Sequence, residues 1–432
     1  MIKWPFLPKD AGLDIVKTEG AYLYTRQGQK ILDAASGAIV NNIGYGREEV
    51  AEAIKEAALN NTYVLPPFLT PEREELLDEL RNHWLPPHLT RVHLSSGGSE
   101  ANESAVKLAI QYQASRGKPE KNLILTRTLS YHGTTLNMSG ISGHAARKRG
   151  LESYVPAPIT VETPYPLRCP LGSFHPEAKD YYLNNLKEVI ERYGANHIAA
   201  LLMEPINGSS GGAIYPPEGY WEEAQKILLD NDILLIADEV MTGFGRTGAM
   251  FAGQKEKVTP DFLCVAKGLT GGYLPMAATL TTQDVFDAFL GEYGEFKTFF
   301  HGHSFTGNQL GAAAALANLD VLQSAASKKK RRALEKLLRG ELALLWSLPN
   351  VGDVRQEGLV AGVELVADWH TREEFPLKEQ VGIRVCEAMV RRGVLTRPIG
   401  NVVPLLPPYC TTQAQLCKMV RVLRESIVEV LG

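Results

Sequence analysis

Short apolar runs alternate with helical patterns from about residue 91 onward. The apolar runs are RVHL, NLIL, HIAALLM, ILLIAD, DFLCVAK and MAATLT, and helical stretches such as GSEANESAVKLAIQYQ lie between them. A further helical stretch extends from about Gln309 to Leu345. Short buried strands that alternate with helices are typical of a largely parallel sheet with helices on both faces. The pattern therefore predicts an α/β fold.

The flanking parts of the chain predict a second, smaller unit. Residues 21–33 have the pattern of a hairpin that turns at Gln27-Gly28, and Thr70 followed by Pro71 is typical of a helix start. After residue 351, strand patterns mix with two more helical stretches. We expect three parts: an N-terminal segment (1–55) that joins the small domain, a large domain (56–320) and a small α+β domain (321–432).

Composition and charge exclude several classes of partner. The 432 residues carry a formal net charge of −4, and 44% of them are hydrophobic, which is ordinary for a globular protein. The basic run from Lys328 to Arg332 fits a solvated helix face. The rest of the sequence has no basic cluster of the kind that binds nucleic acid. Five scattered cysteines form no CxxC pair, and the chain shows no signal pattern and no long apolar run. We expect a cytoplasmic protein with no nucleic-acid, membrane or metal partner.

Candidate ligand-binding residues fall at the expected strand ends. Ligands of open α/β sheets bind at the carboxyl ends of the strands. The stretch SSGGSEANE leads from a strand into a helix, so its free N–H groups suit a phosphate near Gly98 and Ser99, although an ordinary turn explains it equally well. Asp238 ends one buried strand, and Lys267 ends another. A helix cap or metal ligand, and a surface lysine, are the respective alternatives.

Together these groups match the needs of one cofactor. Pyridoxal phosphate (PLP) needs an anion site, an acid opposite its ring nitrogen and an amine for its aldehyde. Gly98, Asp238 and Lys267 would supply all three at one edge of one sheet. Burial would lower the pKa of a lysine in such a cleft and make the amine a better nucleophile. The combination therefore predicts a PLP enzyme.

Several motifs in order resemble those of the class III PLP-dependent aminotransferases. The most specific stretch is DEVMTGFGRTG, followed about 30 residues later by AKGLTGGYLP. Further matches are GGSEANE, SYHG, MEPI and FHGHSFTGNQ, and the resemblance covers the chain from about residue 10 to 430. It implies a fold-type I PLP-dependent transferase, active as a homodimer with its active sites at the subunit interface.

The resemblance also implies roles for individual residues. Lys267 corresponds to the lysine that holds the cofactor covalently and moves the proton, and Asp238 to the acid at the ring nitrogen. Arg397 corresponds to an arginine that binds the substrate carboxylate, with an interdomain ion pair as the alternative. Further cofactor-binding positions are Gly98, Ser99, Tyr131, His132, Glu204, Val240, His303 and Ser304. Further substrate-binding positions are Tyr131, Ile39 and Gly302; the segment from Gly302 to Ser304 would reach the phosphate of the neighbouring subunit.

Two features bear on the substrate. The stretches HGHSFTGNQLGAAAALANLDVL and VLTRPIGNVVPLLPP are similar to the diaminopelargonate aminotransferases of biotin synthesis. Ile39 and Pro404 replace aromatic residues that this family tends to carry, which indicates a different pocket. Ser209 and Ser210 stand where the 4-aminobutyrate and ornithine branches carry a glutamate, so the arginine lacks an acidic switch. We expect amino transfer from an ω-amine or ω-amino acid to a small 2-oxo acid, in particular pyruvate.

Three alternatives stay open at this point. One is a diaminopelargonate aminotransferase. The second is another PLP reaction on the same scaffold, such as an aminomutase, phospho-lyase or decarboxylase, because these also need Lys267 and Asp238. The third is a non-catalytic PLP-binding protein, against which the joint presence of lysine, aspartate and arginine argues. Four aromatic residues are candidates for either pocket lining or ordinary packing: Trp4, Phe6, Tyr22 and Phe68.

Overall fold

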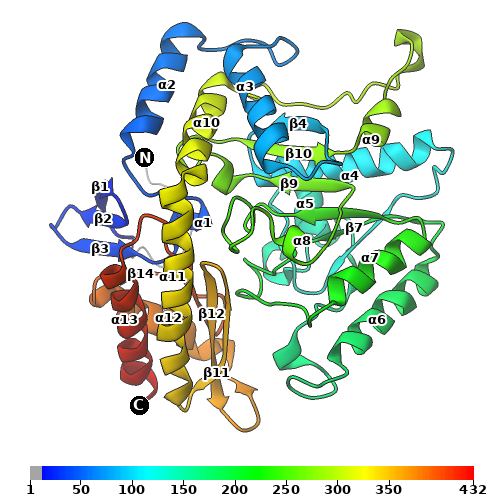
Figure 1. The fold of residues 1–432 in the computed structure, drawn as a ribbon. Helices are drawn as coiled ribbons and strands as arrows, with labels where there is room; N and C mark the ends of the chain where they lie inside the picture. Colours follow the sequence, from blue (N-terminus) through cyan, green and yellow to red (C-terminus); the bar gives the residue numbers. More distant parts are fainter. Residues whose placement is uncertain (1–11) are drawn as a thin grey trace.

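The computed structural model describes residues 12–432. Its centre is a seven-stranded sheet with the order β4-β10-β9-β8-β7-β5-β6 (Figure 1). Neighbouring strands are parallel except for the two pairs that β10 makes. The strands are β4 (Arg91–Ser95), β5 (Leu123–Arg127), β6 (Ile159–Val161), β7 (Ile198–Met203), β8 (Leu234–Asp238), β9 (Phe262–Val265) and β10 (Ala277–Thr281). The predicted mainly parallel sheet is confirmed.

Helices cover both faces of this sheet, as the uninterrupted apolar strands require. Alternate residues of β7 belong to different cores: Leu201 and Met203 pack with α6 and α7, whereas Ala200 and Leu202 pack with α4 and α5. The bounds are α4 (Gly98–Ser115), α5 (Leu136–Ile141), α6 (Ala178–Tyr193) and α7 (Tyr220–Asp230). Both faces of the central strands are therefore dry, and polar ligands can approach only the strand ends.

The remaining strands form two small sheets beside the large one (Figure 1). The predicted hairpin is present, with Gly28 in the left-handed region that its turn requires. It lies in a sheet of β1 (Ile15–Glu19), β2 (Tyr22–Thr25), β3 (Lys30–Asp33) and β14 (Val394–Leu395). The other sheet contains β11 (Val351–Glu357), β12 (Val360–Asp368), β13 (Glu373–Glu374) and β15 (Val402–Leu405). Because β14 pairs with β3, an early and a late segment of the chain share one sheet. The three domain boundaries stay a prediction.

The stretch from Gln309 to Leu345 is two helices rather than one. The first is α10 (Gln309–Gln323) and the second is α11 (Ala325–Ala343). Ser324 separates them with an extended backbone, and its side chain accepts a hydrogen bond from the N–H of Ser327 at 3.2 Å. A serine cap favours a helix start over continuation of the preceding helix. Four further helices lie before and after the large sheet in the sequence: α2 (Glu48–Asn60), α3 (Pro71–Glu79), α12 (Val381–Arg391) and α13 (Gln413–Leu431).

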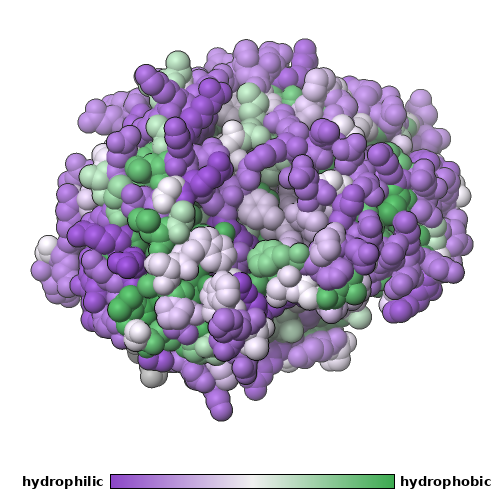
Figure 2. Space-filling view, turned by 60° about the horizontal axis from the view of Figure 1, so that its bottom comes forward, coloured by the Kyte–Doolittle hydropathy of each residue, from purple (hydrophilic) through white to green (hydrophobic). Residues whose placement is uncertain are grey.

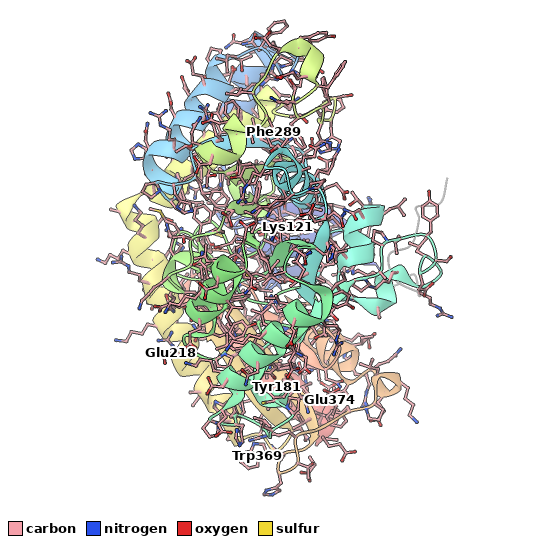
Figure 3. All side chains as sticks on the ribbon, turned by 90° about the vertical axis from the view of Figure 1, so that its right-hand side faces the viewer. Lys121, Tyr181, Glu218, Phe289, Trp369 and Glu374 are labelled. Carbon is pink, nitrogen blue, oxygen red and sulfur yellow. The ribbon has the colours of Figure 1, made fainter. Side chains whose placement is uncertain are left out.

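The amino ends of the central strands are held by the buried Lys121, which is labelled near the middle of the view in Figure 3. Its buried ammonium group donates to the carbonyl groups of Ala195, Ile198, Asn231 and Asp232 at 2.7–3.3 Å. These carbonyls lie at or just before the starts of β7 and β8. This edge of the sheet is thus closed by internal hydrogen bonds, which leaves the carboxyl edge for ligands.

The surface is mostly hydrophilic, with separate hydrophobic patches on the face shown in Figure 2. Within residues 12–432, none of the helices has the length and apolarity needed to cross a bilayer. Phe68 is exposed, and neither it nor Tyr22 lines the cavity described below. Trp4 and Phe6 lie outside the described residues.

Glu239 is a buried carboxyl directly after β8. Its side chain accepts hydrogen bonds from the N–H groups of Ala252 and Gly253 and from the hydroxyl of Thr242, at 2.6–2.8 Å. It thereby holds the start of α8 (Ala252–Lys255) against the loop that follows Asp238. Burial nevertheless raises the pKa of Glu239 from 4.5 to about 7.

This shift predicts a pH-dependent stability. The folded state binds the proton of Glu239 more tightly than the unfolded chain does, so the contribution of Glu239 to stability falls as pH rises from about 4.5 to about 7. Glu239→Gln removes this titration. We expect the urea midpoint of the variant to rise relative to wild type between pH 5 and 8. Glu223→Gln, at an exposed carboxyl bonded to Lys179, is the control and should show no such trend. Wild-type and Glu239→Gln midpoints that run parallel across this range would contradict the assignment.

Candidate active site

A cavity opens at the carboxyl ends of β4, β5, β7, β8 and β9. Its wall contains eight of the predicted catalytic, cofactor-binding and substrate-binding residues, namely Gly98, Ser99, Tyr131, His132, Glu204, Asp238, Val240 and Lys267. The other lining residues are Val40, Ser96, Gly97, Asn102, Gly133, Ile206, Ser209, Met241, Ala266, Thr270, Leu274, Pro275 and Met276. Parallel strands bring these residues to one edge although they are spread over more than 200 positions of the chain.

Lys267 presents an amine to this cavity. Its backbone has φ +31°, an unusual conformation for a residue with a side chain, as occurs at functional sites. No residue between 12 and 432 accepts a hydrogen bond from its Nζ. Burial lowers the pKa of Lys267; Asp238 opposes this, whereas the nearby charge of Arg397 adds to it. The amine is therefore available in its neutral, reactive form more readily than an ordinary lysine.

Asp238 is held as an ordered carboxylate at the end of β8. Its Oδ2 accepts hydrogen bonds from the side-chain amide of Asn102 at 2.8 Å and from Nδ1 of His132 at 2.9 Å. Its Oδ1 accepts the N–H of Val240 at 3.1 Å. Nε2 of His132 lies 3.2 Å from the hydroxyl of Thr126, so both ring nitrogens have partners. These donors orient the carboxyl group, which can pair with a cation in the cavity.

The start of α4 provides an anion site. Ser96, Gly97, Gly98 and Ser99 line the cavity, and the first N–H groups of an α-helix have no partner within the helix. A Cβ at Gly98 would lie 2.7 Å from Cγ1 of Val240, so only glycine fits there. The hydroxyl of Ser99 accepts the N–H of Thr134 at 3.1 Å and keeps its own proton for a ligand.

Tyr131, Val240 and Glu204 shape the rest of the wall. Glu204 accepts the N–H of Tyr131 at 2.9 Å and the N–H of Gly208 at 2.8 Å. Burial raises the pKa of Glu204. The guanidinium of Arg147 lies 4.6 Å from the centre of the Tyr131 ring, a cation–π contact that orients the ring. The cavity is thus bounded by a fixed aromatic ring and the branched side chain of Val240.

Arg397 does not line the cavity, but it is close enough for its charge to lower the pKa of Lys267. It lies after β14, and its side chain is exposed. No ion pair or hydrogen bond of its side chain occurs among the described residues. The alternative reading as an interdomain ion pair thus finds no partner within residues 12–432.

Ile39 is placed beside the cavity rather than in its wall. Its backbone has φ +64°, which turns the side chain into a small apolar cluster with Ala213, Leu406 and Met241. The next residue, Val40, lines the cavity instead. The residue of this segment that faces the cavity is therefore Val40, one position after the residue that the sequence indicated.

The segment from Gly302 to Ser304 also lies away from the cavity of its own chain. Nδ1 of His303 is 3.7 Å from a carboxylate oxygen of Glu100 in the first turn of α4. The carbonyl of Ser304 accepts a hydrogen bond from the hydroxyl of Tyr63 at 2.8 Å. Within one chain these residues therefore make surface contacts near the start of α4.

Several residues of the wall were not singled out from the sequence. Asn102 is the most informative, since it holds Asp238. Its position one helical turn after Gly98, on the same face of α4, is a signal that could have identified it. Val40, Ile206 and Met241 carry no such signal, because apolar residues of a pocket and of a core look alike in sequence.

The residues present fit PLP. The start of α4 suits its phosphate, Asp238 suits a protonated ring nitrogen, and Lys267 suits its aldehyde. The absence of a side chain at Gly98 lets Val240 pack directly against the start of α4, where both residues line the cavity. The positions of Tyr131 and Val240 suit an aromatic ring.

Comparison with known proteins agrees with this assignment. The family model for aminotransferase class III matches residues 8–427. The adenosylmethionine-8-amino-7-oxononanoate aminotransferase of Geobacter sulfurreducens is 42% identical over 97% of this chain and 92% of its own. The crystal structure of that enzyme from Methanocaldococcus jannaschii has a TM-score of 0.91 and 36% identity, covering 100% of this chain and 97% of its own. A PLP-bound amine transaminase from an uncultivated Pseudomonas species has a TM-score of 0.92 and 32% identity, covering 99% of this chain and 98% of its own.

The order of the motifs, the arrangement of the strand-end residues and the matches over nearly the whole length lead to one family. The chain belongs to the class III aminotransferases, which are PLP-dependent enzymes of fold type I.

Proposed function

We propose that this enzyme transfers an amino group to 8-amino-7-oxononanoate, with S-adenosylmethionine as the donor. The observation that carries the proposal is the relative 42% identical over 97% of the chain, which is named for that reaction. Relatives from Anoxybacillus flavithermus and Aquifex aeolicus, 38% and 35% identical, bear the same name. This reading was the alternative at the level of the sequence, and the relatives favour it over transfer to pyruvate.

The strand-end residues have distinct parts in this proposal. Bound PLP supplies an electron-withdrawing ring and a carbonyl group that receives the amino group. Lys267 holds the cofactor and, with its pKa lowered by burial, takes and returns the proton of the substrate carbon. Asp238, oriented by Asn102 and His132, keeps the ring nitrogen protonated.

The remaining wall residues position the cofactor and substrate. Gly98 and Ser99 bind the phosphate through the start of α4, and Glu204 lies near the ring substituents while fixing Tyr131. Tyr131 and Val240, which both line the cavity, would hold the cofactor ring when it is bound. Arg397, exposed and without an ion-pair partner among residues 12–432, binds the substrate carboxylate through its planar fork.

A second candidate is transfer from an ω-amine or ω-amino acid to pyruvate. The observation that favours it is that the aliphatic residues Val40, Ile206 and Met241 line the cavity. Ile39 and Pro404, which stand where diaminopelargonate aminotransferases tend to carry an aromatic residue, do not line it. An aliphatic wall suits small or linear amines better than an adenosyl group that would stack on an aromatic ring. Structural neighbours that are amine transaminases agree with this candidate.

A substrate panel separates the candidates. The purified PLP form would be mixed with S-adenosylmethionine, L-alanine, putrescine, β-alanine and 1-phenylethylamine, and the loss of the cofactor absorbance band would be followed. We expect S-adenosylmethionine to bleach the band and 8-amino-7-oxononanoate to restore it with formation of the diamine product. Bleaching by L-alanine and amines but not by S-adenosylmethionine would favour the pyruvate reading. Elimination or rearrangement products instead of transfer would indicate another PLP reaction.

Lys267→Ala tests the central residue. Without the amine, the cofactor has no covalent link and the substrate carbon has no proton acceptor, so we expect turnover to fall at least about 10⁴-fold. Borohydride reduction and mass spectrometry should label the peptide with Lys267 in wild type and leave that peptide of the variant unlabelled. Lys257→Ala, at an exposed lysine, is the control. Retained labelling of the Lys267→Ala peptide would contradict the assignment.

We further propose a homodimer in which Gly302, His303 and Ser304 reach the phosphate site of the partner. The segment around them exposes three aromatic side chains, Phe296, Phe300 and Phe305, to 70%, 68% and 65%. Exposed aromatic clusters of this kind mark interaction surfaces.

Sedimentation equilibrium tests the dimer. We expect wild type to have twice the mass of the chain, and Phe300→Ser combined with Phe305→Ser to shift it toward the monomer with loss of bound PLP. Phe174→Ser, an exposed aromatic residue on another loop, should leave the mass unchanged. A wild-type monomer with bound PLP and full activity would refute this arrangement.

A further inference from the structure

A turn at residues 208–213 links the cavity to the small domain. At its start, Gly208 donates its N–H to Glu204, whose other oxygen accepts the N–H of Tyr131. The side-chain amide of Asn207 donates to the carbonyl of Leu129 at 2.6 Å. Ser209 lines the cavity. The first half of the turn is therefore part of the active-site wall.

Arg355 of β11 holds the second half of the same turn. Its Nε and Nη2 donate to the carbonyl of Gly212 at 3.1 and 2.9 Å, and Nη2 also approaches the carbonyl of Gly211 at 3.4 Å. Its Nη1 donates to Glu364 at 2.6 Å and to Asp353 at 2.9 Å. The guanidinium is buried, so its planar fork is divided between two carboxylates of the small domain and two backbone carbonyls of the turn.

Backbone packing shows how closely the turn fits the small domain. Gly212 has φ +72°, and a Cβ there would lie 2.5 Å from Cγ1 of Val402 in β15. A Cβ at Gly362 in β12 would lie 2.4 Å from the carbonyl oxygen of Gly212. Val402 also pairs with Ile399, which follows Arg397 by two residues. The turn thus contacts the partner of a residue just after Arg397.

The charges around Arg355 keep this arrangement intact. Although burial favours protonation of Glu364, Arg355 and hydrogen bonds from Tyr165 and Arg168 hold the pKa of Glu364 below its ordinary value. Arg168 contacts Glu364 at 2.7 Å and Glu374 of β13 at 3.2 Å, and it makes no contact with the turn. In Figure 3, Glu374 is labelled beside Tyr181 of α6, and Trp369 is labelled below both.

From these contacts we infer that Arg355 is a positioning residue, which fixes the distance between the carboxylate-binding Arg397 and the cavity that holds Lys267. The inference rests on the proposed role of Arg397. Arg355 touches neither substrate nor cofactor. It acts through the turn at 208–213, because this turn contacts Val402, the partner of Ile399 just after Arg397, and also forms part of the cavity wall. Loss of the fork would loosen Arg397 and leave Lys267 and Asp238 in place.

Arg355→Lys is the variant of choice, since it keeps the charge that Glu364 and Asp353 need and removes the fork that reaches the carbonyls. The matched control is Arg168→Lys, which alters the same ion cluster without touching the turn. Two measurements would be made on the PLP-bound enzymes. The first is hydrogen exchange of peptides that cover residues 204–214 and 396–403. The second is kcat and KM for 8-amino-7-oxononanoate and for its methyl ester, which lacks the carboxylate.

We expect faster exchange of both peptides in Arg355→Lys, and a KM for the acid that rises about tenfold, the size of one weakened charge-assisted hydrogen bond. The KM for the ester, kcat and the cofactor absorbance band should stay close to wild type. Arg168→Lys should behave as wild type. Arg397→Ala should remove the preference for the acid over the ester altogether.

The inference fails if Arg355→Lys and Arg168→Lys give the same exchange and the same ratio of KM values. It also fails if Arg355→Lys lowers kcat equally for acid and ester, since that would show a general structural role. A wild-type enzyme that does not use 8-amino-7-oxononanoate would refute the proposed function; the exchange measurement, which needs no substrate, would then decide the role of Arg355 by itself.

Discussion

The buried carboxylate of Asp238 lies at the carboxyl end of β8, and its burial requires hydrogen-bond donors or a cation around it. A charge in such a place is costly unless donors or a cation compensate it. Asn102 and His132 come from two other elements to donate to it, and Lys267 follows the neighbouring strand. The parallel sheet makes this possible, because its strands end at the same edge. The residues that compensate the Asp238 carboxylate therefore also line the cavity.

The two edges of the sheet, at the amino and the carboxyl ends of its strands, differ in whether their polar groups have hydrogen-bond partners. At the amino ends, Lys121 occupies four carbonyl groups and closes the sheet. At the carboxyl ends, the first N–H groups of α4 and the amine of Lys267 face the cavity without partners among the described residues. Unpaired donors beside a held carboxylate form a site that is electrostatically incomplete by itself, which a phosphate with a cationic ring completes.

Most of the chemistry could be predicted from the sequence, and most of the pocket shape could not. Asp238 and Lys267 were singled out because, together with Gly98, they would bring an acid, an amine and an anion site to one edge of one sheet. Ile39 was expected in the pocket wall, but its positive φ turns it into a neighbouring cluster and leaves Val40 facing the cavity. The helix expected over 309–345 divides at Ser324 because the serine side chain caps a new helix.

The sequence by itself determined the alternation of strands and helices, the residues at the strand ends and the family, because each of these is written in local patterns and motif spacing. Only the tertiary structure decided which apolar side chains form the wall, how Asn102 and His132 share Asp238, and how Arg355 reaches the turn at 208–213. Those outcomes depend on contacts between residues more than a hundred positions apart and on the backbone angles of single residues. Neither kind of feature produces a periodic pattern in the sequence.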